Sequence, residues 1–398
     1  MIMNFSARIL LFATFLMNLG TFAVYTFLAI YLSNILQFSA LQVGSVLTVL
    51  MLTSRILPFF CGSFADIIGY PNSMMYGMIV RALGFFSFSF TSSFEGTIVS
   101  AALTGLGTAL YEPAVGAFFS QQDEKEQKRL FTYFNQSLNA GAIVGPLAGG
   151  ILIQIGASLP FLFGSVIYLI VSLLIFAYRR QLTVKTFSNN SIKNNMVNTL
   201  KDKSFLYFNF IMILFWVMYS QLTVMFPLMM YKITHSQADV SFLVTTNSVC
   251  GLLIMFLLRR LFEIHEPMIL IIRGMIIMAV GLFFTWIFPD KWWLMFCVIL
   301  FTIGETLVLP ASDIKVSLYS RGKASGSYFG LSKISFGIGA SIGSFFGPIL
   351  FELDKWDGLP WLLISLLGLF GSLLMAYLKQ KEIYPVHDSS ANSTPPSS

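Results

Sequence analysis

Apolar segments long enough to cross a lipid bilayer recur along the whole of this chain. A helix needs roughly 20 apolar residues to span about 30 Å of hydrocarbon. We place twelve such segments, at about 8–33, 41–63, 74–94, 96–120, 132–155, 159–178, 205–230, 240–260, 268–288, 292–312, 325–350 and 359–378. Membrane β-barrels instead need short strands in which apolar and polar residues alternate, and no segment shows that pattern. The sequence therefore predicts an all-α polytopic membrane protein.

The balance of residue types agrees with that environment. Hydrophobic residues make up 56% of the chain and charged residues 11%, whereas soluble domains carry about 25% charged residues. The first apolar segment lacks a small-residue cleavage site, so we expect it to remain as a span rather than be removed as a signal peptide. The three cysteines fall inside predicted spans, and the three histidines lie outside them without ligand spacing. We expect neither a metal nor another cofactor.

Basic residues collect on one side of the predicted membrane. With both termini in the cytoplasm, about 17 lysines and arginines, Lys185 among them, lie on the inner side. The outer side has only Lys232, Lys291 and Lys355. Because basic loops stay in the cytoplasm, this asymmetry predicts a plasma-membrane protein with both termini inside. The formal net charge of +6 then reflects topology, and we expect no nucleic-acid partner.

A polar stretch near the middle of the chain separates six predicted spans from six. It runs from Arg179 to Ser204 and includes the Asn-rich segment SNNSIKNNMVNTL. We therefore predict an N-terminal six-helix bundle at 1–178, a cytoplasmic linker at 179–204 and a C-terminal six-helix bundle at 205–380. Residues 381–398 have the polar composition of a disordered tail.

Two pairs of similar segments indicate that the two bundles are copies of one unit. The fourth predicted span contains GTALYEPA at 107–114, and the tenth contains GETLVLPA at 304–311. The fifth contains GAIVGP at 141–146, and the eleventh contains GSFFGP at 343–348. The order is the same in both halves, and the offset is nearly the same. Internal repeats of this kind are typical of secondary transporters.

Two motifs of the N-terminal half resemble motifs of the major facilitator superfamily. GSFADIIGYP at 62–71 resembles the family's loop motif after the second span, and the residues in register are Gly62, Asp66 and Gly69. GAIVGPLAGG at 141–150 resembles the fifth-span motif of the drug:proton antiporter branch, and the residues in register are Gly141, Gly145, Pro146, Gly149 and Gly150. The resemblance covers about residues 8–380.

This resemblance implies two pseudo-symmetric six-helix bundles that rock about a central site by alternating access. It implies a gating role for Gly62, Asp66 and Gly69, in which Asp66 caps or braces neighbouring helix ends. It also implies that the fifth and eleventh spans meet between the halves. Because small residues at four-residue spacing let helices approach closely, we predict that the glycines of the fifth span form the seam between the halves.

The chain departs from the family pattern at two places. The loop motif usually ends in basic residues, whereas residues 70–73 read YPNS, so we expect a weaker charge latch with the neighbouring helices. The antiporter branch also carries an arginine in the fourth span, where this chain has Ala101. The proton-relay role of that arginine therefore cannot be transferred to this position.

Ionisable residues inside spans are costly and usually face a cavity or a partner. Arg55, Arg81 and Glu112 lie at one depth in the N-terminal half. We predict that Glu112 takes up the transported proton and pairs with Arg55 or Arg81 when ionised; a permanent ion pair between helices is the alternative. Glu305 is the second candidate for the proton site. Lys333 lies about eight residues into its span, where a long stem can reach the interface.

Polar and aromatic side chains on the first and seventh spans are candidates for the substrate pocket. Asn18 and Tyr25 share one helix face, as do Trp216 and Tyr219. Such an aromatic stripe also suits ordinary packing. Asn18 and Gln221 are harder to explain in that way, because an unsatisfied amide in hydrocarbon is expensive.

Together, these features predict a monomeric secondary transporter rather than an enzyme. It would export amphipathic drugs or antimicrobials in exchange for protons, with the bilayer, the substrate and protons as its partners. GLGTALYEP lacks the terminal Gly-Lys-Ser/Thr of a P-loop, so coupling to ATP is not expected. The alternative is a dedicated exporter of an anionic or zwitterionic metabolite, such as a staphylopine-like opine metallophore, since guanidinium groups grip carboxylates.

Overall fold

The structure is a computed structural model that describes residues 5–182, 191–353 and 358–383. The predicted tail from 384 onward, part of the predicted linker, and the positions of Lys185 and Lys355 lie outside these ranges. Every regular element within them is a helix. Eleven helices are long and apolar enough to cross a membrane, and the number reaches twelve when a bent pair counts as one span. The predicted all-α fold class is confirmed.

Most helices lie within a few residues of the predicted spans. Their bounds are α1 (Phe5–Ile30), the π-helical turn η1 (Tyr31–Ile35), α2 (Ala40–Ile56), α3 (Pro58–Ile68), α4 (Tyr70–Phe90), α5 (Phe94–Ser120), α6 (Glu124–Ile155), α7 (Leu159–Tyr178), α8 (Ile192–Lys201), α9 (Lys203–Ser220), α10 (Met225–Thr234), α11 (Gln237–Ile264), α12 (Pro267–Phe284), α13 (Lys291–Tyr319), α14 (Ser325–Leu353) and α15 (Leu359–Ile383). Residues 381–383, predicted as part of the tail, belong to α15.

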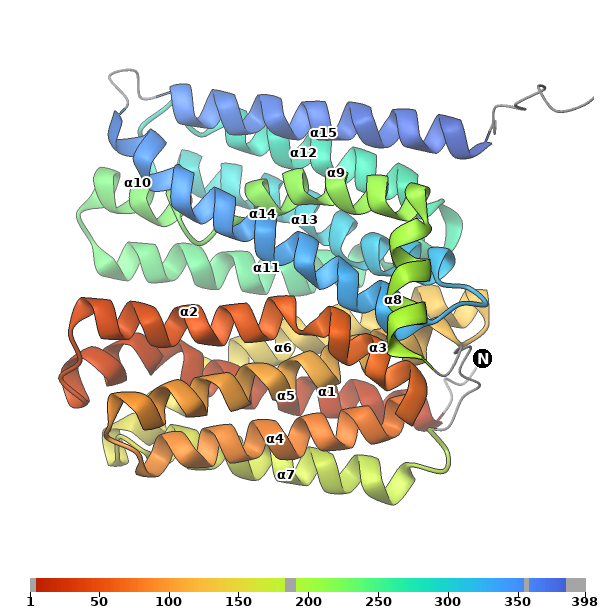
Figure 1. Cartoon of the computed structure of the whole chain (residues 1–398). Coiled ribbons are helices and arrows are strands. Elements are labelled where there is room, and N and C mark those ends of the chain that lie inside the picture. Colours follow the sequence, from red (N-terminus) through yellow and green to blue (C-terminus); the bar gives the residue numbers. More distant parts are fainter. Residues whose placement is uncertain (1–4, 183–190, 354–357, 384–398) are drawn as a thin grey trace, which may run out of the picture.

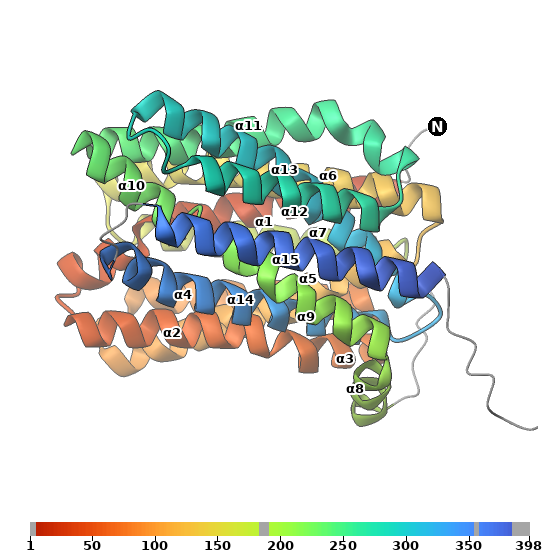
Figure 2. The same ribbon diagram turned by 90° about the horizontal axis from the view of Figure 1, so that it is seen from above.

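The helices form two groups, one above the other in Figure 1. We call α1–α7 the N-half and α9–α15 the C-half; most of their axes run in one direction. The short helix α8 crosses that direction at the end of the bundle where α3 and the N-terminus lie, and Figure 2 shows it beside α3 from above. We call this the α8 end and the other the far end.

The second span is bent where a proline interrupts it. α2 ends at Ile56, α3 begins at Pro58, and the two helices meet at 45°. Proline lacks an amide hydrogen and its ring clashes with the carbonyl four residues earlier, so it kinks or ends a helix. The predicted end of the second span near 63 and the predicted start of the third span near 74 are wrong. In the structure α3 continues to Ile68, and α4 begins at Tyr70. Gly69 alone separates them, with a φ of 89° that favours glycine.

The glycines of the fifth span pack against the first span. A Cβ built on Gly141, Gly145 or Gly149 would lie 2.7, 2.7 or 2.1 Å from backbone oxygens of α1. Gly150 is less crowded and faces an α1 ring at 3.6 Å. α6 continues through Pro146 without interruption. α1 and α6 therefore touch along their backbones, inside the N-half.

The eleventh span repeats this arrangement inside the C-half. A Cβ on Gly339 or Gly343 of α14 would lie 2.5 or 2.7 Å from backbone carbonyls of α9. The prediction that the fifth-span glycines form the seam between the halves is thus wrong. α6 and α14 do touch, through the rings of Phe131 and Phe329 at 5.7 Å, but not through their glycines. Small-residue spacing indicates close approach without saying which neighbour approaches.

Candidate functional site

Charged side chains from both halves meet inside the bundle. Glu112 lies eight residues before the end of α5, and Lys333 lies eight residues after the start of α14. At a rise of 1.5 Å per residue, both lie roughly 12 Å from the α8 end. Lys333 of α14 lies 3.3 Å from Glu112 of α5, Nζ to Oε2, and Nη1 of Arg55 on α2 lies 3.7 Å from the same oxygen. These side chains are 20–26% exposed, so water and salt screen their attraction only in part. The Arg55 guanidinium also lies 4.0 Å from the centre of the Phe336 ring.

Asp313 of α13 completes this group, which we call the central cluster (Arg55, Glu112, Asp313 and Lys333). Asn135 of α6 donates a hydrogen bond to Asp313 at 3.3 Å, and Asp313 is close enough to Lys333 and Glu112 to interact with their charges. Asp313 is not among the residues expected from the sequence, because the tenth span is predicted to end at 312, whereas α13 continues to Tyr319. Lys333 is expected to extend toward the membrane interface, whereas in the structure its ammonium points inward to Glu112.

Arg81 lies among helices of the N-half and makes no ion pair with the central cluster, although its charge acts on Arg55 and Glu112 through space. Its Nη2 donates to the Thr21 hydroxyl of α1 at 3.0 Å, and its guanidinium lies 4.8 Å from the centre of the Tyr168 ring of α7. Within the described ranges no carboxylate oxygen comes within 4 Å of Arg81. Of the two predicted partners of Glu112, the structure pairs Arg55 with it and not Arg81, because Arg81 projects toward α1 and α7.

Glu305 of α13 is held by an amide rather than by a cation. Asn247 of α11 donates to its Oε2 at 3.1 Å and to the Thr302 hydroxyl at 2.9 Å. Arg273 lies in the preceding predicted span and is the arginine whose predicted depth in the membrane comes nearest to that of Glu305. Its side chain is exposed. In the part of the chain that the structure describes, no lysine or arginine nitrogen lies within 4 Å of Glu305. The two predicted proton sites therefore have different surroundings.

Some of the predicted pocket residues gather beside the central cluster. The rings of Trp216 and Tyr219 on α9 lie 5.2 Å apart, and Phe336 lies 4.3 Å from Trp216. Phe336 is the ring that packs on Arg55. Tyr25 of α1 is half-buried and is close enough to Arg55 to interact with it. Aromatic faces from α1, α9 and α14 thus adjoin the charged group.

Two other predicted pocket residues are used by the fold itself. Nδ2 of Asn18 donates to the Leu138 carbonyl of α6 at 2.6 Å. Gln221 is fully buried at the break between α9 and α10, and its Nε2 donates to the carbonyls of Val217 at 2.7 Å and Gly343 at 3.3 Å. Both amide nitrogens find the partners that burial demands. Both join helices within one half, and the Oε1 atom of Gln221 is buried without a hydrogen-bond partner.

Asp66 caps a helix of the opposite half at the α8 end. Its carboxylate accepts hydrogen bonds from the N–H groups of Gly326 and Ser327 at 2.8 and 3.0 Å, and from the Ser327 hydroxyl at 2.9 Å. The Tyr70 hydroxyl donates to the same carboxylate at 3.0 Å. These N–H groups open α14, where the helix dipole favours a negative charge. This is the bracing role expected of Asp66, exerted from a helix rather than from a loop.

Gly62 lets the halves touch backbone to backbone at the same end. A Cβ on Gly62 would lie 2.0 Å from the Gly326 carbonyl oxygen, and one on Gly326 would lie 2.2 Å from the Gly62 oxygen. Gln121, which directly follows α5, donates to the Ser325 hydroxyl of α14 at 2.8 Å. Gly69 has no neighbour within 4 Å of an added Cβ, so it serves the turn between α3 and α4. The α8 end is therefore closed by main-chain contact and hydrogen bonds.

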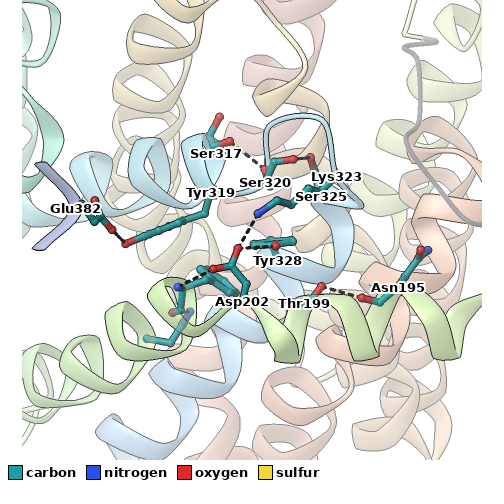
Figure 3. Close-up of polar contacts among 12 residues, drawn as sticks. Asn195, Thr199, Asp202, Ser317, Tyr319, Ser320, Lys323, Ser325, Tyr328 and Glu382 are labelled. Carbon is teal, nitrogen blue, oxygen red and sulfur yellow. Dashed lines mark hydrogen bonds and ion pairs between the residues drawn. The ribbon is translucent and has the colours of Figure 1, made fainter. Parts of the chain in front are cut away.

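A second polar group at the α8 end lies around the start of α9 (Figure 3). Lys323 and the Tyr328 hydroxyl bind Oδ2 of Asp202 at 2.7 and 2.8 Å. Burial alone would raise the pKa of Asp202, but hydrogen bonds from Lys323, Tyr328 and a backbone N–H of α9 hold that pKa below its ordinary value. Figure 3 also shows Tyr319 bonded to Glu382 of α15. No sequence pattern points to these pairs, since polar residues at span ends are usually solvated.

Nothing in the described ranges groups three His, Cys, Asp or Glu side chains in a way that could hold a metal ion. The three cysteines are free, two of them buried and Cys250 half-buried. The chemistry to be explained is that of charged and hydrogen-bonding side chains.

Comparison with known proteins places this arrangement in a family. The sequence model of the Major Facilitator Superfamily matches residues 10–235 and 208–397. Multidrug resistance protein MdtH of Shigella sonnei is 25% identical to this chain over 383 residues, which cover 94% of each protein. MdtH of Escherichia coli is also 25% identical over 383 residues, with the same coverage.

Two solved structures share the fold. The crystal structure of the human organic anion transporter MFSD10 (TETRAN) has a TM-score of 0.74 and 12% identity, over 93% of this chain and 98% of that one. The crystal structure of the E. coli fucose:proton symporter FucP has a TM-score of 0.72 and 14% identity, over 94% and 98%. The family match extends over both halves and agrees with the twelve-span fold. This multi-pass membrane protein belongs to the major facilitator superfamily of transporters.

Proposed function

We propose that the protein, acting as a monomer, exports amphipathic small molecules in exchange for protons, and that the central cluster couples the two movements. The observation that carries this proposal is the position of Glu112, whose carboxylate faces Arg55 from its own half and Lys333 from the other. A protonated Glu112 would lose its charge, and with it the attraction to both cations. A single proton would thereby weaken a contact between the halves.

Transport by alternating access requires the α8 end to open while the far end closes. Asp66 and the contact between Gly62 and Gly326 hold the α8 end shut in this structure. A two-state equilibrium shifts only when one state is stabilised more than the other. Because the pair of Glu112 and Lys333 ties α5 to α14, neutralising Glu112 favours the state in which the halves part at the α8 end.

The proposal places the α8 end and both termini in the cytoplasm of the cell. Lys125 and Arg129 at the start of α6 and Lys201 of α8 lie at that end, whereas the far end carries Lys232 and Lys291. In this orientation the structure is closed toward the cytoplasm. Protons then reach Glu112 from outside and leave it inside, and the substrate moves in the opposite direction.

Amphipathic drugs are the cargo class that this site supports best. The relatives at 25% identity are multidrug resistance proteins, and the rings of Trp216, Tyr219 and Phe336 beside the cluster offer flat apolar faces to such molecules.

The charge of the cluster bears on the alternative of an anionic metabolite. That alternative rests on guanidinium groups near one glutamate. The central cluster itself has two cations and two carboxyl groups, whereas Arg81 makes no ion pair with it but acts through space on the charges of Arg55 and Glu112. Drug-like cargo is the better-supported class because the relatives and the aromatic faces both favour it.

Flux into proteoliposomes tests the proposal. The full-length protein is reconstituted, a pH gradient with an acidic lumen is imposed, and the uptake of a fluorescent lipophilic cation is followed. We expect uptake that a protonophore abolishes, because protons leaving the lumen drive the dye inward. Dye uptake that ignores the pH gradient would contradict proton exchange. Gradient-driven flux of a polycarboxylate without flux of the dye would favour the anionic alternative.

The same assay isolates the role of Glu112. Glu112→Gln removes the charge and keeps the shape, so we expect gradient-driven uptake to fall by more than about tenfold, the factor equivalent to about 1.4 kcal/mol. Glu95→Gln is the matched control, because Glu95 lies exposed in the first turn of the same helix. Its uptake should equal that of the wild type. Full activity of Glu112→Gln would remove Glu112 from the mechanism.

A further inference from the structure

Arg81 is a buried cation without a counter-ion among the described residues. Its side chain is 2% exposed, and its Nε and Nη1 atoms have no hydrogen-bond partner. Nη2 donates to the Thr21 hydroxyl at 3.0 Å, and Tyr25 of α1 is the other hydrogen-bonding neighbour of the guanidinium. A guanidinium carries five N–H donors and stays protonated in proteins, so burial cannot be relieved by loss of its proton. Arg81 therefore calls for an additional acceptor.

The groups around Arg81 supply few acceptors and one more unmet donor. The Thr21 hydroxyl gives its proton to the Met17 carbonyl at 2.7 Å, so the Tyr168 hydroxyl, 3.0 Å away, donates to Thr21. The buried hydroxyl of Tyr111 has no hydrogen-bond partner within 3.5 Å; it lies near Thr14 of α1 and is close enough to Arg81 to interact with its charge. Side chains from α1, α4, α5 and α7 thus surround a position that is rich in donors.

The helices around Arg81 are closely packed. A Cβ on Gly107 of α5 would lie 2.6 Å from the backbone nitrogen of Arg81. A Cβ on Gly164 of α7 would lie 2.5 Å from the ring of Phe85 on α4. A ligand of many atoms would force these helices apart.

The nearest acid does not balance the charge of Arg81. Glu112 acts on Arg81 through space, while its Oε2 already faces Lys333 at 3.3 Å and Arg55 at 3.7 Å. The two arginines and one glutamate of the N-half therefore leave one positive charge inside the membrane. A water molecule could accept hydrogen bonds there but would not neutralise that charge, whereas a monovalent anion does both.

We propose that Thr21, Arg81, Tyr111 and Tyr168 form a binding site for a small monovalent anion such as chloride. The guanidinium supplies the charge and the free N–H donors, and the Tyr111 hydroxyl supplies a further donor. The site belongs to the N-half alone and does not depend on the proposed drug export. A substrate carboxylate has related chemistry, so the experiment separates halides from carboxylates.

The halide dependence of thermal unfolding tests the site. The full-length protein is purified in sodium gluconate, and chloride or bromide replaces gluconate at constant ionic strength. We expect the unfolding temperature to rise with halide and to saturate, because a ligand that binds only the folded state stabilises it. A temperature that does not change on replacement would overturn the proposal. A rise with acetate but not with halide would assign the site to carboxylates and would also overturn it.

Variants connect that response to Arg81. Arg81→Gln should abolish the halide-dependent rise, and Tyr111→Phe should move its midpoint to a several-fold higher chloride concentration. Arg273→Gln is the matched control, because Arg273 lies exposed on α12 and should retain the wild-type response. If Arg81→Gln does not fold, Tyr111→Phe carries the test, and an unchanged midpoint in that variant overturns the proposal.

Bromide locates the ion directly through its anomalous scattering. Crystals of the wild-type protein grown in saturating bromide should show an anomalous peak at hydrogen-bonding distance from the Arg81 guanidinium. Density there without an anomalous signal would mean an ordered water and would overturn the anion assignment.

Discussion

Glu112 and Glu305 lie on corresponding helices of the two halves, α5 and α13, yet their partners differ in kind. Glu112 faces one cation from each half, whereas Glu305 accepts a hydrogen bond from Asn247 of its own half. A cation loses its attraction when an acid is protonated, but a side-chain amide can bond to the ionised or the neutral form. A proton on Glu112 would thus bear on the contact between the halves, and a proton on Glu305 would bear on one half.

Among the substitutions that test this comparison, removal of Lys333, the cation from the opposite half, should have the largest effect on transport. Lys333→Met keeps an apolar stem but ends the attraction across the halves, so we expect the initial rate of gradient-driven dye uptake to fall about tenfold, equivalent to about 1.4 kcal/mol. Proteoliposomes that contain equal amounts of protein give the measurement.

A charge-preserving substitution separates this loss from a packing defect. Lys333→Arg should retain most of the uptake, because its guanidinium can still face Glu112. If Lys333→Met transports like the wild type, the pair between the halves is not the coupling element and the contrast with Glu305 loses its meaning.

Neutralising Glu305 should have a much smaller effect on transport. Glu305→Gln keeps a carbonyl oxygen for Asn247, so we expect uptake within about threefold of the wild type. Glu305→Ala leaves the buried Asn247 amide short of an acceptor and should cost about 1–3 kcal/mol of stability, measured as a lower unfolding temperature. Loss of coupled uptake in Glu305→Gln would instead move the proton site to the C-half.

Asp202 offers a lysine–carboxylate pair that does not join the halves, and its removal should have the smallest effect on transport. Because its pKa lies below the ordinary value, the ionised form stabilises the folded protein above about pH 4, and this contribution is lost as pH falls through the lowered pKa. Asp202→Asn should therefore lower the unfolding temperature at pH 7 by a few degrees and have little effect at acid pH. A difference that persists unchanged at acid pH would mean that charge is not its origin. Dye uptake should stay at the wild-type rate.

The sequence predicts the spans well but the pairings inside them only in part. Length and apolar character place the helices, and Arg55 and Glu112 stand out because charges are rare in spans. Lys333 and Asp313 lie nearer to span ends, where a long side chain or a shifted boundary makes water an equally good partner. Their contacts depend on α5, α13 and α14 being neighbours, which is tertiary information.

The glycine-rich fifth span is a second case in which the sequence predicts a contact but not the partner helix. Gly141, Gly145 and Gly149 at four-residue spacing indicate close approach, but the spacing does not distinguish α1 from a helix of the other half. In the structure α14 packs on α9 as α6 packs on α1, so the internal repeat extends to the helix partners. The repeat in the sequence does not by itself identify those partners.

The main-chain contact between Gly62 and Gly326 affects which positions of this protein can be substituted. The point where the halves close consists of main-chain atoms of two glycines, and a side chain added to either glycine would clash with the other. The rings of Trp216 and Tyr219 lie on α9, away from that point. In the proposed mechanism, substitutions on α9 would therefore change the surface that meets the cargo and leave the closing contact of the gate as it is.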